Sequence, residues 1–297
     1  MSLPTPLRLS GRENLPFASA LLGTTGVFVL LIVSLLVANV MFVDGEHIKA
    51  ALNSPEIIWA IKLSLVTCTI TAVLSVLVAV PAGYLLARVP FRGRAFVDAL
   101  VDVPIVLPPI VVGLALLLLF NQTDVGRWLE GIVSTVLAWC NDIAPGVMEW
   151  LGMEGPGRRG LTFDIPGVIL AQWAVASAFA IRTMRVAFEQ TDDRRERVAL
   201  VLGCTRRQAF QWVALPEVKQ GVIAAGTLAW ARALGEFGPI LVFAGATRMK
   251  TEVLPTTVFL EMNVGNVEAA ATVSLLMVAV AMAVLLSARA LGARIGV

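Results

Sequence analysis

The stretch EQTDDRRERVALVLGCTRRQAFQWVALP occupies residues 189–216 and lies between two long apolar segments. Although it is charged, its residues predict ordered structure. A first short helix is expected over residues 194–202, capped by Thr191, Asp192 or Asp193. Gly203 then occupies the place where a left-handed residue terminates a helix. The stretch therefore begins as a helix that ends in a glycine turn.

A second short helix is expected directly after this turn. Thr205 and Gln208 have the spacing of a capping box, in which each side chain bonds the backbone N–H of the other. We expect this helix to end near Leu215, with Pro216 in the first turn of the next apolar segment. The pattern alone fits two roles equally, an amphipathic connector on a membrane surface or a helix pair that docks a partner protein.

The chain on either side of this stretch has the composition of a membrane protein. Of its 297 residues, 58% are hydrophobic and 15% are charged, whereas soluble domains carry about 25% charged residues. A helix needs about 20 apolar residues to cross the hydrocarbon core. We therefore expect an all-α membrane protein with about six transmembrane helices, at residues 17–43, 57–87, 95–120, 165–188, 221–243 and 267–286.

The distribution of basic residues predicts the orientation. With the N-terminus in the cytoplasm, the inner segments hold fifteen lysines and arginines and the outer segments hold six. Basic residues accumulate on the cytoplasmic side of membrane proteins. Both termini are therefore expected inside, with residues 1–16 as a cytoplasmic tail and residues 189–216 as a cytoplasmic loop. The first apolar stretch lacks a cleavage site and is expected to be a span rather than a signal peptide.

One external loop, residues 121–164, is unusually long. It contains Trp128, Trp139 and Trp150, with a short apolar run between the first two. Tryptophan gathers at membrane interfaces. An interfacial helix is favoured over a re-entrant element, and both keep the ends of the loop outside.

The loop at 189–216 resembles the cytoplasmic loop of binding-protein-dependent ABC importer permeases, whose pattern is E-A-A-x3-G-x9-I-x-L-P. The match runs through Arg197, Val198, Ala199, Gly203, Val213, Leu215 and Pro216, with every spacing kept. Arginine stands for the leading glutamate, and the nearest acid is Glu196, one place earlier. The resemblance implies a type I importer permease fold, with residues 57–290 as the permease core.

In that family this loop is the coupling helix that docks on a cytoplasmic ATPase subunit. The chain has no GxxxxGK[ST] motif, so it is not expected to bind ATP itself. ATP and Mg²⁺ would belong to the partner ATPase, and this chain would bind no cofactor. It would be a transport subunit of a prokaryotic inner membrane rather than an enzyme.

Two further stretches narrow the resemblance, VPIVLPPIVVG at residues 103–113 and ARALGEFGPILVFAG at residues 231–245. Both are similar to permeases of sulfate, molybdate and tungstate importers. This branch implies a tetrahedral oxyanion as substrate, alternating access as the mechanism and an external solute-binding protein as a partner. It also implies a second permease subunit, and a homodimer is expected. Nucleic acid is not expected as a partner.

Prolines and glycines within the apolar segments mark possible breaks. Pro104, Pro108 and Pro109 remove backbone donors from the third span. Gly235 and Gly238 allow the fifth span to flex. Broken membrane helices line cavities or are buried in protein, so a packing kink and a pore-lining break both remain open.

Charged residues within spans are a second candidate set. Asp98 and Asp102 are four residues apart, as are Arg232 and Glu236, and the second two can form an ion pair. Charges at this depth face the bundle interior or water. They could line the translocation pathway or lock helices together, for instance through Asp102 and Arg232, and the lock is slightly favoured.

The sequence disfavours the other function classes. Its three cysteines are scattered and His47 is its one histidine, which argues against a metal site or an intramembrane hydrolase. No feature resembles a channel selectivity filter. An ion-driven secondary transporter is the main alternative, although it predicts inverted repeats that the chain does not show.

Overall fold

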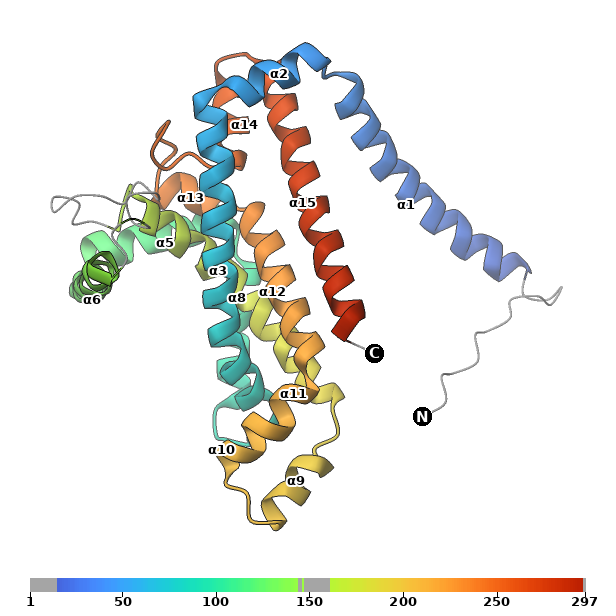
Figure 1. Cartoon of the computed structure of the whole chain (residues 1–297), viewed down its shortest axis with the longest axis vertical. Coiled ribbons are helices and arrows are strands. Elements are labelled where there is room, and N and C mark those ends of the chain that lie inside the picture. The colour runs from blue at the N-terminus through green and yellow to red at the C-terminus, as the bar shows by residue number, and fades with distance from the viewer. Residues whose placement is uncertain (1–14, 144–145, 147–160, 296–297) are drawn as a thin grey trace.

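The computed structural model describes residues 15–143, 146 and 161–295, and every regular element in those ranges is helical. The bundle in Figure 1 is built around α3 (Pro55–Arg88), α8 (Ile165–Gln190) and α12 (Lys219–Leu234). α15 (Val267–Ile295) packs along α12, while α1 (Leu15–Met41) leans away from the other helices. The expected all-α membrane class is confirmed.

Four helices in the described ranges, α1, α3, α8 and α15, are long and apolar enough to cross a membrane. A fifth span results if the bent pair α4 (Arg94–Val106) and α5 (Pro109–Gln122) is counted as one. The expected span at 221–243 is divided, because α12 ends after 16 residues and α13 (Gly238–Phe243) follows. The structure thus has four to five candidate spans where the sequence predicts about six, and the difference lies in interrupted helices.

The first interruption follows from two adjacent prolines. α4 and α5 meet at an angle of 111°. Leu107 is extended, with ψ 141°, because the ring of a following proline disfavours the helical conformation. Pro109 then starts α5, where its missing N–H is no loss. Pro104 lies inside α4 without ending it, so the break predicted for this span comes from Pro108 and Pro109.

The second interruption lies between α12 and α13. The N–H groups of Gly235 and Glu236 still bond to Ala231 and Ala233, at 3.4 and 3.2 Å, and this closes α12. Phe237 has φ −120° and ψ −55°, outside the regular helix. Pro239 cannot donate to a preceding turn, so the chain restarts as a separate helix at Gly238.

Small and polar residues line the inside of α3. Ser64, Thr67, Thr71 and Ser75 are all buried there. Gln172 of α8 is 1% exposed, accepts a bond from Thr71 at 3.2 Å, and donates to the carbonyl of Ala233 on α12 at 3.3 Å. Since lipid offers no hydrophobic drive between helices, close packing and such bonds hold membrane bundles together. Gln172 thereby joins all three central helices.

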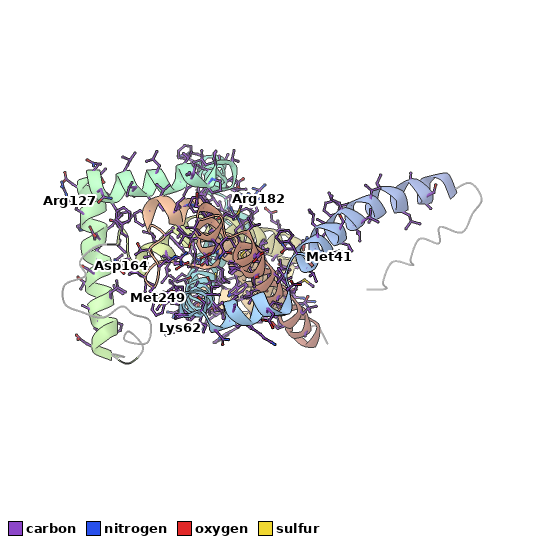
Figure 2. All side chains as sticks on the ribbon, turned by 90° about the horizontal axis from the view of Figure 1, so that it is seen from above. Met41, Lys62, Arg127, Asp164, Arg182 and Met249 are labelled. Carbon is purple, nitrogen blue, oxygen red and sulfur yellow. The ribbon has the colours of Figure 1, made fainter. Side chains whose placement is uncertain are left out.

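The long loop contains one regular helix, α6 (Asp124–Ile143), which turns away from α5 and runs across its end (Figure 2). Trp128 and Trp139 are each 65% exposed on it, while Leu129 and Val133 pack against the core. The expected helix is therefore present, and its placement at a membrane interface stays a prediction. Trp150 lies outside the described residues.

Different helices lie at the two ends of the bundle. α2 (Gly45–Asn53) and α14 (Leu254–Asn263) lie at one end, and the helices of the 189–216 loop lie at the other (Figure 1).

α3 approaches α8 closely at Gly83. A Cβ atom there would lie 2.7 Å from the Cβ of Met184 and 2.8 Å from the backbone nitrogen of Arg185. We expect Gly83→Ala to lower the free energy of unfolding by about 1–3 kcal/mol, because neither helix can yield without repacking. Modification of buried Cys68 by a thiol reagent during heating measures the change.

Gly26→Ala in α1 is the matched control. Nothing lies within 4 Å of a Cβ built at Gly26, so the same substitution there should leave the unfolding temperature unchanged. An equal loss of stability in both variants would show that the effect does not come from the α3–α8 contact.

Candidate functional site

The predicted glycine-linked helix pair is present. In α9 (Arg194–Val201) the N-cap residue Asp193 makes no side-chain cap bond, and the side chain of Asp192 before it accepts a bond from the Arg194 N–H at 2.9 Å. Gly203 has φ +94°, and the N–H of Cys204 bonds to the carbonyl of Ala199 at 3.0 Å. This is the left-handed ending that the sequence predicts. Of the three proposed caps, Asp192 makes the bond.

The second helix begins as expected and continues differently. Thr205 accepts from the Gln208 N–H at 3.3 Å, and Gln208 accepts from the Thr205 N–H at 2.8 Å, so the capping box is confirmed. α10 (Arg206–Ala209) then passes through a π-helical turn, Phe210–Ala214, into α11 (Leu215–Glu217). The wider turn accommodates Pro216, which has no N–H to donate. The helix therefore does not stop near Leu215 but runs almost without interruption into α12.

Contacts to α3 fix both ends of this loop. The Tyr84 hydroxyl donates to Glu196 of α9. Arg88 donates to the carbonyl and the hydroxyl of Thr191, at 2.7 and 2.8 Å. The Tyr84 ring also packs edge-on against Phe188 and Phe210, with centroids 5.4 and 4.7 Å apart. The loop is thus attached to the end of α3 as well as to its own flanking helices.

The opposite face of α9 is free within the described chain. Val201 is 87% exposed and Leu202 is 80% exposed, with Val198 beside them at 56%. Arg197 is also exposed and pairs with Asp193 at 2.7 Å. Ala199 points inward and is 9% exposed. α9 therefore presents an apolar surface with a basic border while Glu196 faces the bundle.

The second part of the loop, which includes Val213, Leu215 and Pro216 of the family pattern, is bonded to α9. Ala214 is buried, Val213 and Leu215 are half-buried and Pro216 is exposed. Arg195 bonds to Glu217 at 3.1 Å, which ties α9 to α11. The loop is therefore internally braced, and its exposed apolar groups are those of α9 together with Trp212 of the π-helical turn, which is 66% exposed.

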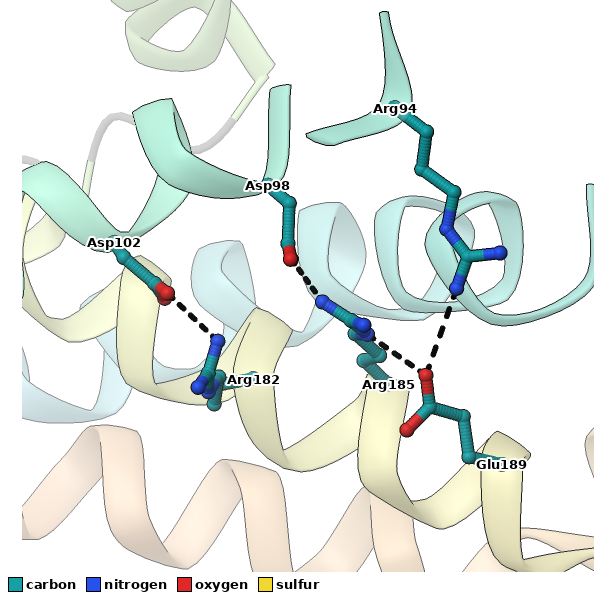
Figure 3. Close-up of polar contacts among 6 residues, drawn as sticks. All are labelled: Arg94, Asp98, Asp102, Arg182, Arg185 and Glu189. Carbon is teal, nitrogen blue, oxygen red and sulfur yellow. Dashed lines mark hydrogen bonds and ion pairs between the residues drawn. The ribbon is translucent and has the colours of Figure 1, made fainter. Parts of the chain in front are cut away.

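The charges in α4 pair with α8 rather than with α12. Figure 3 shows Asp98 bonded to Arg185, and Asp102 bonded to Arg182 at 2.7 Å. Glu189 continues the row, at 2.9 Å from Arg185 and 3.6 Å from Arg94. The expected lock between Asp102 and Arg232 is wrong, because the bend at Pro108 directs α4 along α8. The shared helix face of Asp98 and Asp102 is confirmed.

Arg232 instead pairs with Glu236, which lies just after the end of its own helix. Its guanidinium lies 2.6 Å from Glu236, as the four-residue spacing predicts, and 5.5 Å from the ring centroid of Phe179. Glu236 is 1% exposed. A buried carboxylate beside one arginine leaves little positive charge to attract an anion.

The two interrupted helices meet at their interruptions. A Cβ at Gly113 of α5 would lie 2.7 Å from the Cα of Pro239 in α13, and one at Gly238 would lie 3.0 Å from the nitrogen of Ile110. Only glycine permits so close a backbone approach. Pro109, Gly113, Gly238 and Pro239 thereby form one contact, which we call the break contact. Gly235 lies just before this contact, and a Cβ built there would meet nothing closer than 3.8 Å.

Sequence reasoning missed the partners of these groups. Tyr84 is the one tyrosine of the chain, and its place at the end of a long apolar span could have drawn attention to it. Arg182 and Arg185 were counted only as basic residues of the inner side. Nothing in the sequence indicates that they face α4.

Comparisons with known proteins agree with this architecture. The family model described as binding-protein-dependent transport system inner membrane component matches residues 79–297. The chain is 29% identical over 294 residues to the sulfate transport system permease protein CysT of Salmonella typhimurium, covering 98% of each chain. It is 33% identical over 252 residues to the molybdenum transport system permease protein ModB of Mycobacterium tuberculosis, covering 84% of this chain and 86% of that one.

The chain is also 29% identical over 236 residues to the molybdate/tungstate transport system permease protein WtpB of Pyrococcus abyssi, and the match covers 80% of each chain. Among solved structures, a bacterial alginate ABC transporter in complex with its pentasaccharide-bound periplasmic protein contains a chain with a TM-score of 0.70. That chain is 18% identical, with 96% of each covered, so the likeness supports the fold.

The Tyr84–Glu196 bond can be tested by removing one hydroxyl. Tyr84→Phe keeps the aromatic contacts and deletes a bond to a carboxylate, which contributes about 1.5–3 kcal/mol in proteins. Since this bond is only partly buried, we expect amide hydrogen exchange over residues 196–201 to become about tenfold faster.

Thr183→Val is the control, because the Thr183 hydroxyl bonds to the carbonyl of Phe179 in its own helix, at 2.9 Å. It should leave exchange in α9 unchanged. Unchanged exchange in Tyr84→Phe as well would mean that the bond does not hold the loop.

Proposed function

Because the chain belongs to the binding-protein-dependent transport system inner membrane components, a family of non-catalytic, multi-pass permease subunits, we propose that it imports a tetrahedral oxyanion. Molybdate, tungstate and sulfate are the candidates, since the sulfate and molybdenum permeases above resemble it along most of its length. The energy for import would come from ATP hydrolysis in a partner subunit.

The loop at 189–216 is our candidate for the docking site of that ATPase. The observation that carries this assignment is the exposed apolar face of α9, formed by Val198, Val201 and Leu202 on a helix braced from behind by Tyr84. A rigid helix with an apolar face suits an apolar groove on a partner. The basic border suits acidic groups at the rim of such a groove.

The topology proposed with this assignment keeps both termini in the cytoplasm. It places the 189–216 loop inside, where nucleotide is available. The opposite end of the bundle, with α2 and α14, then faces the external solute-binding protein. Two copies of this chain would form the pathway between them, as a homodimer.

The row of ion pairs in Figure 3 supplies a route for movement. α8 continues directly into the docking loop, and Arg182 and Arg185 attach α4 to it. We assign Asp98 and Asp102 to this lock rather than to the pathway. A displacement of α9 by the ATPase would then move α8 and α4 together.

We assign the gate to the break contact between α5 and α13. Broken membrane helices occur where backbone lines a cavity or is buried in protein, and here Gly113 and Gly238 leave no room for a side chain between the two breaks. Movement of α4 acts on Pro108 and Pro109 and would open this contact. Alternating access would follow, with ATP binding opening the pathway outward and hydrolysis resetting it.

Co-expression with candidate ATPase subunits tests the function. We expect stable co-purification, and ATP hydrolysis that rises when binding protein loaded with one oxyanion is added; that anion identifies the substrate. In the same assay Leu202→Asp should abolish co-purification, because it places a charge in the apolar contact. Failure to bind any ATPase, with uptake that follows an ion gradient, would contradict the proposal.

Gln190→Glu is the matched control for Leu202→Asp. It adds the same charge at an exposed position at the end of α8, outside the α9 surface. It should retain the ATPase subunit and its stimulation.

The gate assignment predicts opposite results at two neighbouring glycines. Gly238→Leu should abolish transport, because its side chain would enter the space beside Ile110 and separate α13 from α5. Gly235→Ala should transport normally, since its Cβ meets only carbonyl oxygens at 3.8 and 3.9 Å. Uptake of labelled anion into proteoliposomes measures both. Normal uptake by Gly238→Leu would remove the break contact as a gate.

A further inference from the structure

Two residues adopt a backbone conformation that their side chains disfavour. Among the described residues, Phe163 and Met249 are the only non-glycine residues with positive φ, at 59° and 58°. Such a conformation costs about 1–3 kcal/mol for each residue and persists only where the surroundings impose it. Both side chains are large, apolar and exposed, Phe163 to 54% and Met249 to 49%. They therefore gain little burial in return for the strain.

The two residues belong to loops that touch each other. Phe163 precedes α8, and its N–H bonds to the carbonyl of Phe243 at 3.2 Å. Lys250, next to Met249, donates to the Phe163 carbonyl at 2.7 Å. A Cβ built at Gly245 would lie 3.2 Å from the Phe163 ring. Residues 163 and 245–250 thus form one continuous patch, which we call the two-loop patch.

The frame beneath the patch is closely hydrogen-bonded. The carbonyl of Thr247 accepts from the N–H groups of Lys250, Thr251 and Glu252, at 3.0–3.1 Å. The Thr251 hydroxyl accepts from the Thr247 N–H at 3.1 Å and donates to Gly245 at 3.2 Å. Thr251 and Glu252 are fully buried. The loop therefore holds Met249 in its strained conformation from below and leaves the side chain outside.

The patch lies toward the end of the bundle opposite α9 and α10. Figure 1 places the loop between α13 and α14 far from those helices, and Figure 2 shows Met249 on the side viewed from above, with Asp164 nearby. In the topology proposed above, this side faces outward. Arg248 and Lys250 give the patch a basic border, although Arg248 also pairs with Glu261 at 2.7 Å.

We propose that the two-loop patch is a docking surface for the external solute-binding protein, with Phe163 and Met249 as its apolar anchors. The inference rests on the proposed function and names the residues that meet this partner. Aromatic and methionine side chains are enriched at the centre of protein interfaces, and two apolar anchors on a fixed frame lower the entropic cost of binding. The matching surface would be an apolar depression with acidic groups around it.

A folded partner explains these features better than lipid does. Contact with lipid requires apolar side chains but no particular backbone conformation. Here two backbone positions are strained and braced so that two side chains stand at fixed points, which suits a surface of defined shape.

The test uses the complete permease–ATPase complex in nanodiscs, with the binding protein and the oxyanion that stimulate ATP hydrolysis most. Met249→Gly and Phe163→Gly remove the anchors and also relieve the strain, because glycine accepts positive φ freely. We expect each variant to weaken binding of the loaded protein at least tenfold. Basal ATP hydrolysis and retention of the ATPase subunit should not change, and the unfolding temperature should stay equal or rise.

Met41→Ala is the control, because Met41 is 81% exposed at the end of α1, away from the patch (Figure 2). Unchanged affinity in both glycine variants, with wild-type stimulation intact, would overturn the docking surface and leave the proposed function standing. A lowered unfolding temperature, or loss of nanodisc incorporation with normal affinity, would also overturn it, since the residues would then serve the fold or the lipid contact. Absence of ATPase association in the wild type would reject the proposed function itself.

Discussion

An interrupted helix within hydrocarbon exposes backbone N–H and C=O groups that lipid cannot satisfy, at a cost of several kcal/mol each. This chain has two such interruptions, and most of its architecture follows from how they are accommodated. The ends of α4, α5, α12 and α13 satisfy their own groups in short turns, for instance Val111 to Pro108 at 2.9 Å and Leu241 to Phe237 at 2.9 Å. The two breaks then pack on each other through Gly113 and Gly238, while Leu107, Pro108 and Pro109 at the first break stay exposed in this single chain.

The same interruption frees α4 to follow a different direction from α5. Its short length leaves little apolar contact of its own, and none of its residues is buried. The ion pairs from Asp98 and Asp102 to α8 provide polar attachments in their place. Through these pairs α4 is connected to α8 and to the 189–216 loop that follows it, whereas α5 lies on the other side of the bend and makes the break contact with α13.

The features that the sequence predicted correctly are those governed by short-range rules. The cap at Asp192, the left-handed Gly203 and the box between Thr205 and Gln208 each depend on residues within four places of one another. The partners of Asp102 and Tyr84 depend instead on how helices far apart in the chain rotate and cross, and one bend of 111° redirected a whole set of charges. The length of an apolar segment was misleading for a similar reason, since residues 221–243 are long and mostly apolar but contain Gly238-Pro239, whose effect on helix continuity depends on what packs against the break. The strain at Phe163 and Met249 had no local signal at all.

The departure of α9 from the family pattern has a geometric explanation. Successive residues on a helix are rotated by about 100°, so moving the acid from position 197 to 196 changes the side it faces. Glu196 turns toward Tyr84 and braces the helix from within, while Arg197 occupies the outward position and pairs with Asp193. The outward face thereby loses a negative charge and gains a positive one. Having the acid at position 196 and arginine at position 197 therefore alters both the attachment of α9 to α3 and the charge on its exposed face.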